Sequence, residues 1–129
     1  MSEPKRRILI VDDEPDILWS LSLLLERDYD VTTAEDGKTA LQALADGPYH
    51  AVILDLMMPG ITGFEVCEQL RASVPTARTP ILALTGYDTL QNEDKIKAAG
   101  ASGYMAKPFE VPKFISEIER LCERGKRGV

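Results

Sequence analysis

Three short apolar runs, each ending abruptly in a polar residue, constrain the fold of this chain more than any other feature. The runs are Ile8 to Val11, Ala51 to Leu54 and Ile81 to Leu84. Because their apolar residues are continuous rather than alternating, both faces of each strand must be covered, which is typical of a parallel sheet. Two weaker strands are predicted at Asp30 to Ala34 and Gly103 to Ala106.

Helical patterns fill the intervals between these strands. The first helix is predicted from Pro15, with Ile17, Leu21, Leu24 and Leu25 recurring at helical spacing. The later helices are predicted at Lys38 to Ala45, Phe64 to Ala72, Leu90 to Ala99 and Phe114 to Cys122. Strand and helix alternate with short connections, so the sequence predicts one three-layer α/β domain around a parallel sheet.

Trp19 and Leu23 lie beside the main apolar stripe of the first predicted helix. Large apolar side chains are usually covered, so we interpret both residues as a widening of the buried face of this helix. The alternative interpretation is a patch that docks a partner protein.

The chain is acidic, with 15 Lys and Arg against 21 Asp and Glu and a net charge of -6. This charge repels phosphate backbones and anionic lipids, so we expect no direct binding to nucleic acid or to a membrane surface. No apolar run is long enough to span a bilayer. Cys67 and Cys122 have neither metal-ligand nor redox spacing, which fits a reducing compartment. We therefore expect a cytoplasmic protein.

The polar residues that close the strands predict a reactive site. They are Asp12, Asp13, Asp55, Thr85 and Lys107. Ligands of open parallel sheets bind beyond the carboxyl ends of the strands, so all five residues should share one edge. Crowded carboxylates repel one another unless a cation neutralises them, and Mg²⁺ suits a few carboxylates together with an incoming phosphate.

A carboxylate at this place is able to attack phosphorus and form an acyl phosphate. In this scheme Lys107 balances charge on the transferring oxygens, and the Thr85 hydroxyl donates a hydrogen bond to one of them. Simpler interpretations stay open at this point. Asp12 and Asp13 are also suited to capping a helix, and Asp55 to forming a turn. Lys107 is also consistent with an ordinary surface lysine.

Four segments resemble the receiver domains of two-component response regulators. They are ILIVDDEP from Ile8, VILDLMMPG from Val52, ALTGY from Ala83 and GYMAKPF from Gly103. The resemblance runs from about Arg6 to Cys122 and implies a flavodoxin-like, doubly wound (βα)5 domain with strand order 2-1-3-4-5. We expect an N-terminal tail at 1–5, the receiver domain at 6–123 and a C-terminal tail at 124–129, with no output domain in this chain.

The resemblance also implies a role for each site residue. Asp55 matches the phosphoacceptor, and Mg²⁺ would be held by Asp12, Asp13, Asp55 and the backbone carbonyl of Met57. Lys107 matches the lysine that contacts the phosphoryl group, while Thr85 and Tyr104 match the switch pair. The family also implies a cis Lys107–Pro108 bond, and Met57 and Tyr87 beside the path of the hydrolytic water.

The function implied by the resemblance is a signalling switch. A histidine kinase or a histidine phosphotransfer protein phosphorylates it, and a changed surface on the fourth helix, fifth strand and fifth helix regulates a partner or output domain. Such a domain catalyses only its own phosphorylation and slow autodephosphorylation. Many transcription-factor receivers dimerise through acidic residues at the positions of Ser102 and Gly103, so we expect a monomer or weak dimer here.

Two alternative functions belong to other classes of protein. A flavodoxin-like electron carrier would share the fold, but the acidic Asp12, Asp13 and Glu14 would repel a flavin phosphate. An aspartyl phosphatase typically places a second aspartate two residues after the nucleophile, and that position is Met57. The residues therefore argue against both alternatives.

Overall fold

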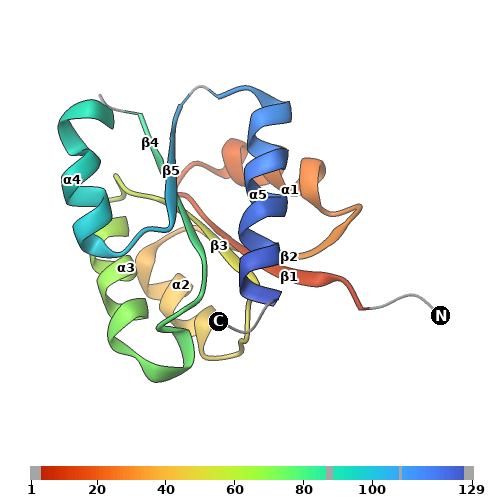
Figure 1. The fold of residues 1–129 in the computed structure, drawn as a ribbon, viewed down its shortest axis with the longest axis horizontal. Helices are drawn as coiled ribbons and strands as arrows, with labels where there is room; N and C mark the ends of the chain where they lie inside the picture. The colour runs from red at the N-terminus through yellow and green to blue at the C-terminus, as the bar shows by residue number, and fades with distance from the viewer. Residues whose placement is uncertain (1–3, 87–88, 108, 127–129) are drawn as a thin grey trace.

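The computed structural model describes residues 4–86, 89–107 and 109–126, in which strands and helices alternate along the chain (Figure 1). The strands are β1 (Arg6–Val11), β2 (Tyr29–Ala34), β3 (Ala51–Asp55), β4 (Ile81–Thr85) and β5 (Gly103–Ala106). The α-helices are α1 (Pro15–Leu25), α2 (Gly37–Leu44), α3 (Gly63–Ala72), α4 (Thr89–Ala99) and α5 (Val111–Lys126). A short 3-10 helix, η1 (Val74–Thr76), follows α3.

The strands form one parallel sheet in the order β2-β1-β3-β4-β5, which confirms the expected doubly wound topology. The chain first moves from β1 outward to β2 and then returns to the other side of β1 to form β3. The strand order therefore reverses between β1 and β3. In open α/β sheets the crevice beyond such a reversal point is the usual ligand site.

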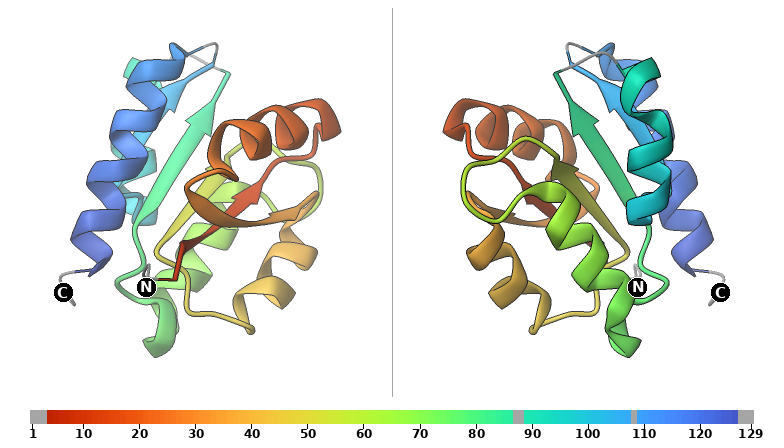
Figure 2. Two further views of the ribbon diagram at one scale, coloured as in Figure 1. Left: turned by 90° about the vertical axis from the view of Figure 1, so that its right-hand side faces the viewer. Right: turned by 90° about the vertical axis from the view of Figure 1, so that its left-hand side faces the viewer.

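Helices cover both faces of the sheet (Figure 2). α1 and α5 pack on one face, and α2, α3 and α4 pack on the other. This two-sided cover explains the uninterrupted apolar runs, because every residue of β3 and β4 is buried. The edge strands β2 and β5 are partly exposed, which is why their sequence patterns are weaker.

Local signals set most element boundaries within a few residues of those predicted. Pro15 occupies the first turn of α1, and the side chains of Asp36 and Thr62 cap α2 and α3 by accepting backbone N–H bonds. α5 is longer than the predicted Phe114 to Cys122, because the residues added at its two ends do not continue the apolar repeat. Across the described ranges, no helix combines the length and apolar character needed to cross a membrane.

The interpretation of Trp19 and Leu23 as part of the buried face of α1 is wrong. Trp19 is 67% exposed and Leu23 is 49% exposed, whereas the buried residues of the helix are Leu18, Leu21 and Leu25. Trp19 and Leu23 are one helical turn apart, so they share a stripe. This stripe lies on the solvent side of the helix.

Candidate functional site

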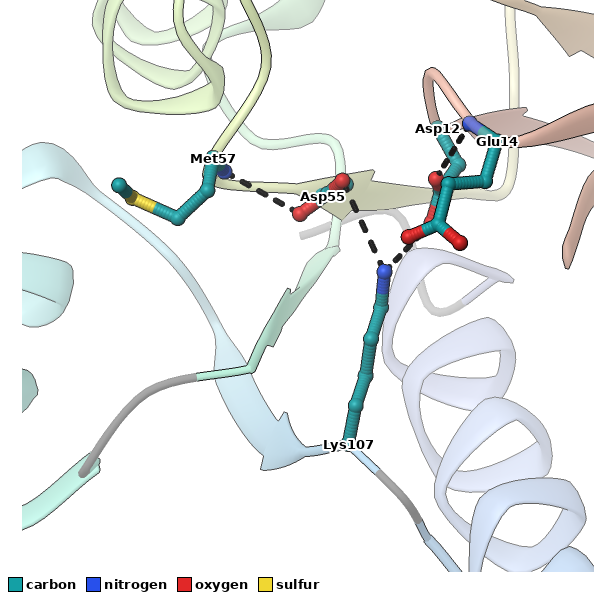
Figure 3. A network of polar contacts seen from close by, with 5 residues as sticks. All are labelled: Asp12, Glu14, Asp55, Met57 and Lys107. Atoms are coloured by element: carbon teal, nitrogen blue, oxygen red, sulfur yellow. Dashed lines mark hydrogen bonds and ion pairs between the residues drawn. The ribbon is translucent and has the colours of Figure 1, made fainter.

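The five polar residues predicted to close the strands lie at the carboxyl-terminal edge of the sheet. Asp12 and Asp13 directly follow β1, Asp55 and Thr85 are the last residues of β3 and β4, and Lys107 directly follows β5. Figure 3 shows the side chains of Asp12, Asp55 and Lys107 converging on one point from three different strands. The topology thus gathers residues that are up to 95 positions apart in the sequence.

Asp12 is completely buried, and both of its carboxylate oxygens have partners (Figure 3). Oδ1 accepts a hydrogen bond from the backbone N–H of Glu14 at 2.9 Å, and Oδ2 accepts one from Lys107 Nζ at 2.8 Å. Glu14 is the N-cap residue of α1. Among the described residues, no side chain caps this helix start, so the interpretation of Asp12 and Asp13 as capping residues is wrong. The Asp12 carboxylate instead forms a buried ion pair with Lys107.

Asp55 is 4% exposed, and its two oxygens face different donors. Oδ1 accepts a hydrogen bond from the Met57 backbone N–H at 3.1 Å, while Oδ2 lies 3.6 Å from Lys107 Nζ. Burial raises the pKa of Asp55 to about 6, and the charges of Asp12 and Asp13 contribute in the same direction. The Met57 N–H and the Lys107 ammonium oppose this rise. Asp55 is thus a crowded carboxylate that another cation would stabilise.

Lys107 bridges the two buried carboxylates. Burial disfavours its charged form, but the hydrogen bond to Asp12 and the charges of Asp55 and Asp12 outweigh that effect and raise the pKa of Lys107. Its backbone N–H donates to the carbonyl of Thr85 at 2.7 Å, which ties the residue after β5 to the end of β4. Lys107 is therefore a fixed, permanently charged group at neutral pH rather than an ordinary surface lysine.

The acidic residues provide oxygen atoms that suit a divalent cation. One carboxylate oxygen each from Asp12, Asp13 and Asp55 lie within 4.8 Å of one another. Asp12 and Asp55 are buried, whereas Asp13 is exposed at the solvent side of the cluster. Lys107 pairs with Asp12 and Asp55, and the cluster adds the third carboxylate of Asp13. Hard oxygen donors of this kind are what Mg²⁺ prefers. The residues fit the expected ion, while the Met57 carbonyl as a further ligand stays a prediction.

The two expected switch residues lie on neighbouring strands. Thr85 is 2% exposed and follows Leu84, which pairs with Asp55 in the sheet. Tyr104 pairs with Ala83, is partly buried and packs against a cluster formed by Leu56, Ala83 and Ile96. Burial and a hydrogen bond to Glu93 of α4 raise the pKa of Tyr104. The aromatic ring is therefore neither fully exposed nor fully buried in this structure.

Gly63 is a site residue that the sequence patterns do not single out. A Cβ atom at this position would lie 2.2 Å from the carbonyl oxygen of Asp55 and 2.6 Å from the Cα of Leu56. The Gly63 N–H also donates to the Leu56 carbonyl at 3.2 Å. The loop after β3 thus packs directly on the backbone of the candidate phosphoacceptor, and a side chain would push the two apart. The only sequence signal was a glycine beside a predicted helix start.

Two expectations fall outside the described residues. Tyr87 was expected beside the path of the hydrolytic water, and Pro108 was expected to follow a cis peptide bond. Both stay predictions. Met57 lies within the described residues and is 51% exposed, and its side chain points away from Asp55 in Figure 3.

Comparison with known proteins decides the family. Residues 8–119 match the family model described as the response regulator receiver domain. The chain belongs to this family. The four motifs and the sheet-edge constellation are therefore those of a receiver domain of two-component signalling, a phosphorylation-dependent switch. This result favours the switch over the electron-carrier and phosphatase alternatives.

Individual relatives agree with this assignment. The transcriptional regulatory protein TcrA of Mycobacterium tuberculosis is 39% identical over 120 residues, covering 92% of this chain and 47% of TcrA. A putative response regulator from Chloroflexus aurantiacus has a TM-score of 0.87 at 33% identity, covering 94% of this chain and 99% of that one. The beryllofluoride-activated DrrB receiver domain has a TM-score of 0.83 at 29% identity, covering 92% and 98%. The chain spans about half the length of the first curated relatives that it matches.

Proposed function

We propose that Asp55 accepts a phosphoryl group from a phosphohistidine of a histidine kinase or a histidine phosphotransfer protein. The observation that carries this proposal is the position of the buried Asp55 carboxylate beside Asp12 and Asp13, with Lys107 Nζ 3.6 Å from its Oδ2. An Asp55 oxygen attacks phosphorus, and the phosphorus–nitrogen bond of the donor breaks. The electron pair of that bond goes to the imidazole nitrogen, and Asp55 becomes an acyl phosphate.

Asp12, Asp13, Asp55 and the Met57 carbonyl would hold Mg²⁺, which would balance negative charge on the transferring phosphoryl oxygens. The residues of the chain supply the rest. Lys107, already fixed by Asp12, offers an ammonium to a phosphoryl oxygen. The Met57 N–H holds Asp55 Oδ1, so that the carboxylate has one orientation before the donor arrives.

Direct labelling tests the proposal. Acetyl phosphate with Mg²⁺ should add one phosphoryl group to the wild-type protein, and chelation of Mg²⁺ with EDTA should prevent the addition. Intact-protein mass spectrometry measures the stoichiometry, and peptide mapping should place the group on the segment that contains Asp55. Labelling of a different segment would contradict the assignment of the phosphoacceptor.

The lifetime of the phosphorylated state is proposed to depend on Met57 and Tyr87. Neither side chain is a strong base, and hydrolysis requires a water positioned in line with the phosphorus–oxygen bond. We expect slow autodephosphorylation in the wild type and a several-fold faster decay in Met57→Asn, whose amide is able to orient water. Decay of the labelled protein over time gives both rates. Equal or slower decay in Met57→Asn would show that this side chain does not control access of water.

We further propose that Thr85 transmits phosphorylation to Tyr104. The Thr85 hydroxyl would bond to a phosphoryl oxygen, and the space that it leaves would allow Tyr104 to move inward against the cluster of Leu56, Ala83 and Ile96. The changed surface would comprise α4, β5 and α5. A partner discriminates the two states only by its differential affinity for them, so we expect a graded effect on binding.

Thr85→Ala should accept phosphate on Asp55 but transmit it poorly. With beryllofluoride as the phosphate mimic, amide chemical shifts of the wild type should change at Tyr104 and along α4. Those of Thr85→Ala should change mainly around Asp55. Equal changes along α4 in the two proteins would mean that the signal takes another route.

Several finer assignments are part of the same proposal. We infer that residues 6–123 form the receiver unit, that the domain acts as a monomer or weak dimer, and that it does not contact nucleic acid itself. Its only catalysis is its own phosphorylation and slow autodephosphorylation. The buried free thiols of Cys67 and Cys122 support a reducing, cytoplasmic location. TcrA is named as a transcriptional regulatory protein, which supports an output of that kind for a partner or a linked domain.

A further inference from the structure

One arginine in the last turn of α3 connects that helix to two other segments of the chain. Arg71 Nε donates to the carbonyl of Gly100 at 2.9 Å, and Nη2 donates to Ser102 Oγ at 3.3 Å. Nη1 donates to the carbonyl of Thr79 at 2.7 Å, and it also contacts the carbonyls of Thr76 at 3.3 Å and Ala77 at 3.2 Å. A single guanidinium therefore joins α3, the approach to β4 and the connection between α4 and β5.

The connection between α4 and β5 is also fixed by hydrogen bonds that do not involve Arg71. Gly100 has φ +109°, a left-handed conformation that favours glycine, and its N–H donates to the Lys97 carbonyl at 3.0 Å. Ser102 N–H donates to the Ile81 carbonyl at 2.8 Å, and Ser102 Oγ accepts the Ile81 N–H at 3.0 Å. A Cβ on Gly100 would lie 2.6 Å from Arg71 Cγ, so the arginine stem packs directly on this backbone.

The other end of α4 is close in sequence to the switch threonine. The helix begins at Thr89, four positions after Thr85, and α3 and α4 lie side by side on one face of the sheet (Figure 2). Between the two ends, Ile96 is fully buried and Glu93 pairs with Lys97 of the same helix at 2.9 Å. The network around Arg71 thus holds the carboxyl-terminal end of α4, at the opposite end of the helix from Thr85.

We propose that Arg71 anchors the carboxyl-terminal end of α4 to α3, so that α4 responds to phosphorylation by pivoting about Gly100 to Ser102. This inference rests on the proposed function for its trigger, but the anchor exists in the unmodified protein. On phosphorylation, the displacement of α4 is greatest toward its amino-terminal end and smallest at Gly100 to Ser102. A planar guanidinium is able to bridge several acceptors in fixed directions, which a lysine ammonium does not do.

The anchor is tested first without phosphate, by amide hydrogen exchange. Arg71→Met keeps an apolar stem and removes the bridging donors, so exchange at Gly100 and Ser102 should become about tenfold faster or more. The matched control is Arg6→Met, since Arg6 lies on β1 and forms its ion pair with Glu123 of α5. Arg6→Met should leave exchange at Gly100 and Ser102 unchanged. Unchanged exchange at these amides in Arg71→Met would overturn the proposal.

The pivot is tested by adding beryllofluoride and Mg²⁺. In the wild type, amide shift changes should decrease from Glu93 toward Gly100 and be smallest at Gly100 to Ser102, whereas in Arg71→Met they should extend through Ser102. Equal changes at Glu93 and Ser102 in the wild type would overturn the pivot. If beryllofluoride changes no amide shift, the assignment of Asp55 as phosphoacceptor and the pivot that depends on it are both wrong. The role of Arg71 as an anchor is still decided by the exchange experiment.

A milder variant covers the case in which Arg71→Met does not fold. Ser102→Ala removes one acceptor of Arg71 and the acceptor of the Ile81 N–H, while the bonds to the carbonyls remain. We expect a few-fold faster exchange at Ser102 and Ile81, and a shift pattern that extends past Gly100. Wild-type behaviour of this variant in both measurements would count against the anchor.

Discussion

Replacing Asp55 with Asn should abolish phosphorylation completely and at the same time stabilise the metal-free protein. The amide nitrogen of Asn is not a nucleophile toward phosphorus, and the buried neighbour Asp12 is not available in its place. Asp12 has both oxygens occupied, by the Glu14 N–H and by Lys107. Labelling with acetyl phosphate under the conditions used for the wild type measures the first effect. Wild-type labelling of Asp55→Asn would contradict the assignment.

The gain in stability follows from the pKa of Asp55, which rises from 3.8 to about 6 on folding. Because the folded protein favours the protonated form, the stabilisation from this proton is complete below about pH 4 and is lost as the pH rises through 6. Asn has no such proton to lose. After allowance for the weakened pairing with Lys107, we expect Asp55→Asn to be more stable by about 1–2 kcal/mol at pH 7.

Urea unfolding in EDTA measures this difference. The free energies of unfolding of the two proteins should be similar near pH 4 and should separate between pH 4 and pH 6. Mg²⁺ should reduce the difference between the two free energies of unfolding at pH 7. The bound ion would offset the repulsion among the carboxylates of the wild type. Lower stability of Asp55→Asn at pH 7 would show that the Asp55 carboxylate stabilises the fold and is not strained by its neighbours.

Replacing Asp13 with Ala should remove most of the Mg²⁺ affinity, with a smaller loss for Asp12→Ala. Asp13 is exposed beside the two buried carboxylates, so it faces the side from which a hydrated ion arrives. Asp12 already binds Lys107 and the Glu14 N–H, and a water molecule is able to take its place toward the ion. We expect a loss of about 100-fold or more for Asp13→Ala and about 10-fold for Asp12→Ala.

Calorimetric titration with Mg²⁺ measures both affinities. Asp16→Ala is a matched control, because Asp16 is an exposed acidic residue in the first turn of α1 that does not belong to the cluster. This variant should bind Mg²⁺ like the wild type. Affinities of the Asp12 and Asp13 variants that match this control would contradict the proposed metal site. A larger loss for Asp12→Ala than for Asp13→Ala would reverse the roles assigned to them.

The fold class and the edge that carries the site follow from the sequence alone. A run such as Ala51 to Leu54 is apolar without interruption only because helices cover both faces of its strand, and Asp55 marks the point at which that cover ends. Parallel strands align their carboxyl ends, so this local polarity pattern also predicts that Asp12, Asp55 and Lys107 share an edge. Both predictions need only signals within a few residues of each strand.

Other features depend on contacts between segments far apart in the chain, which no local pattern encodes. The sequence does not show that Lys107 bonds Asp12 at 2.8 Å and lies 3.6 Å from Asp55. Exposure of Trp19 depends on which side of α1 meets the sheet, and the apolar character of the residue suggested the wrong answer. Gly63 and Arg71 look ordinary in the sequence, because their roles arise only where one backbone packs against another. Tertiary packing decides these contacts, because the covalent chain does not fix the distance between groups that are far apart in the sequence.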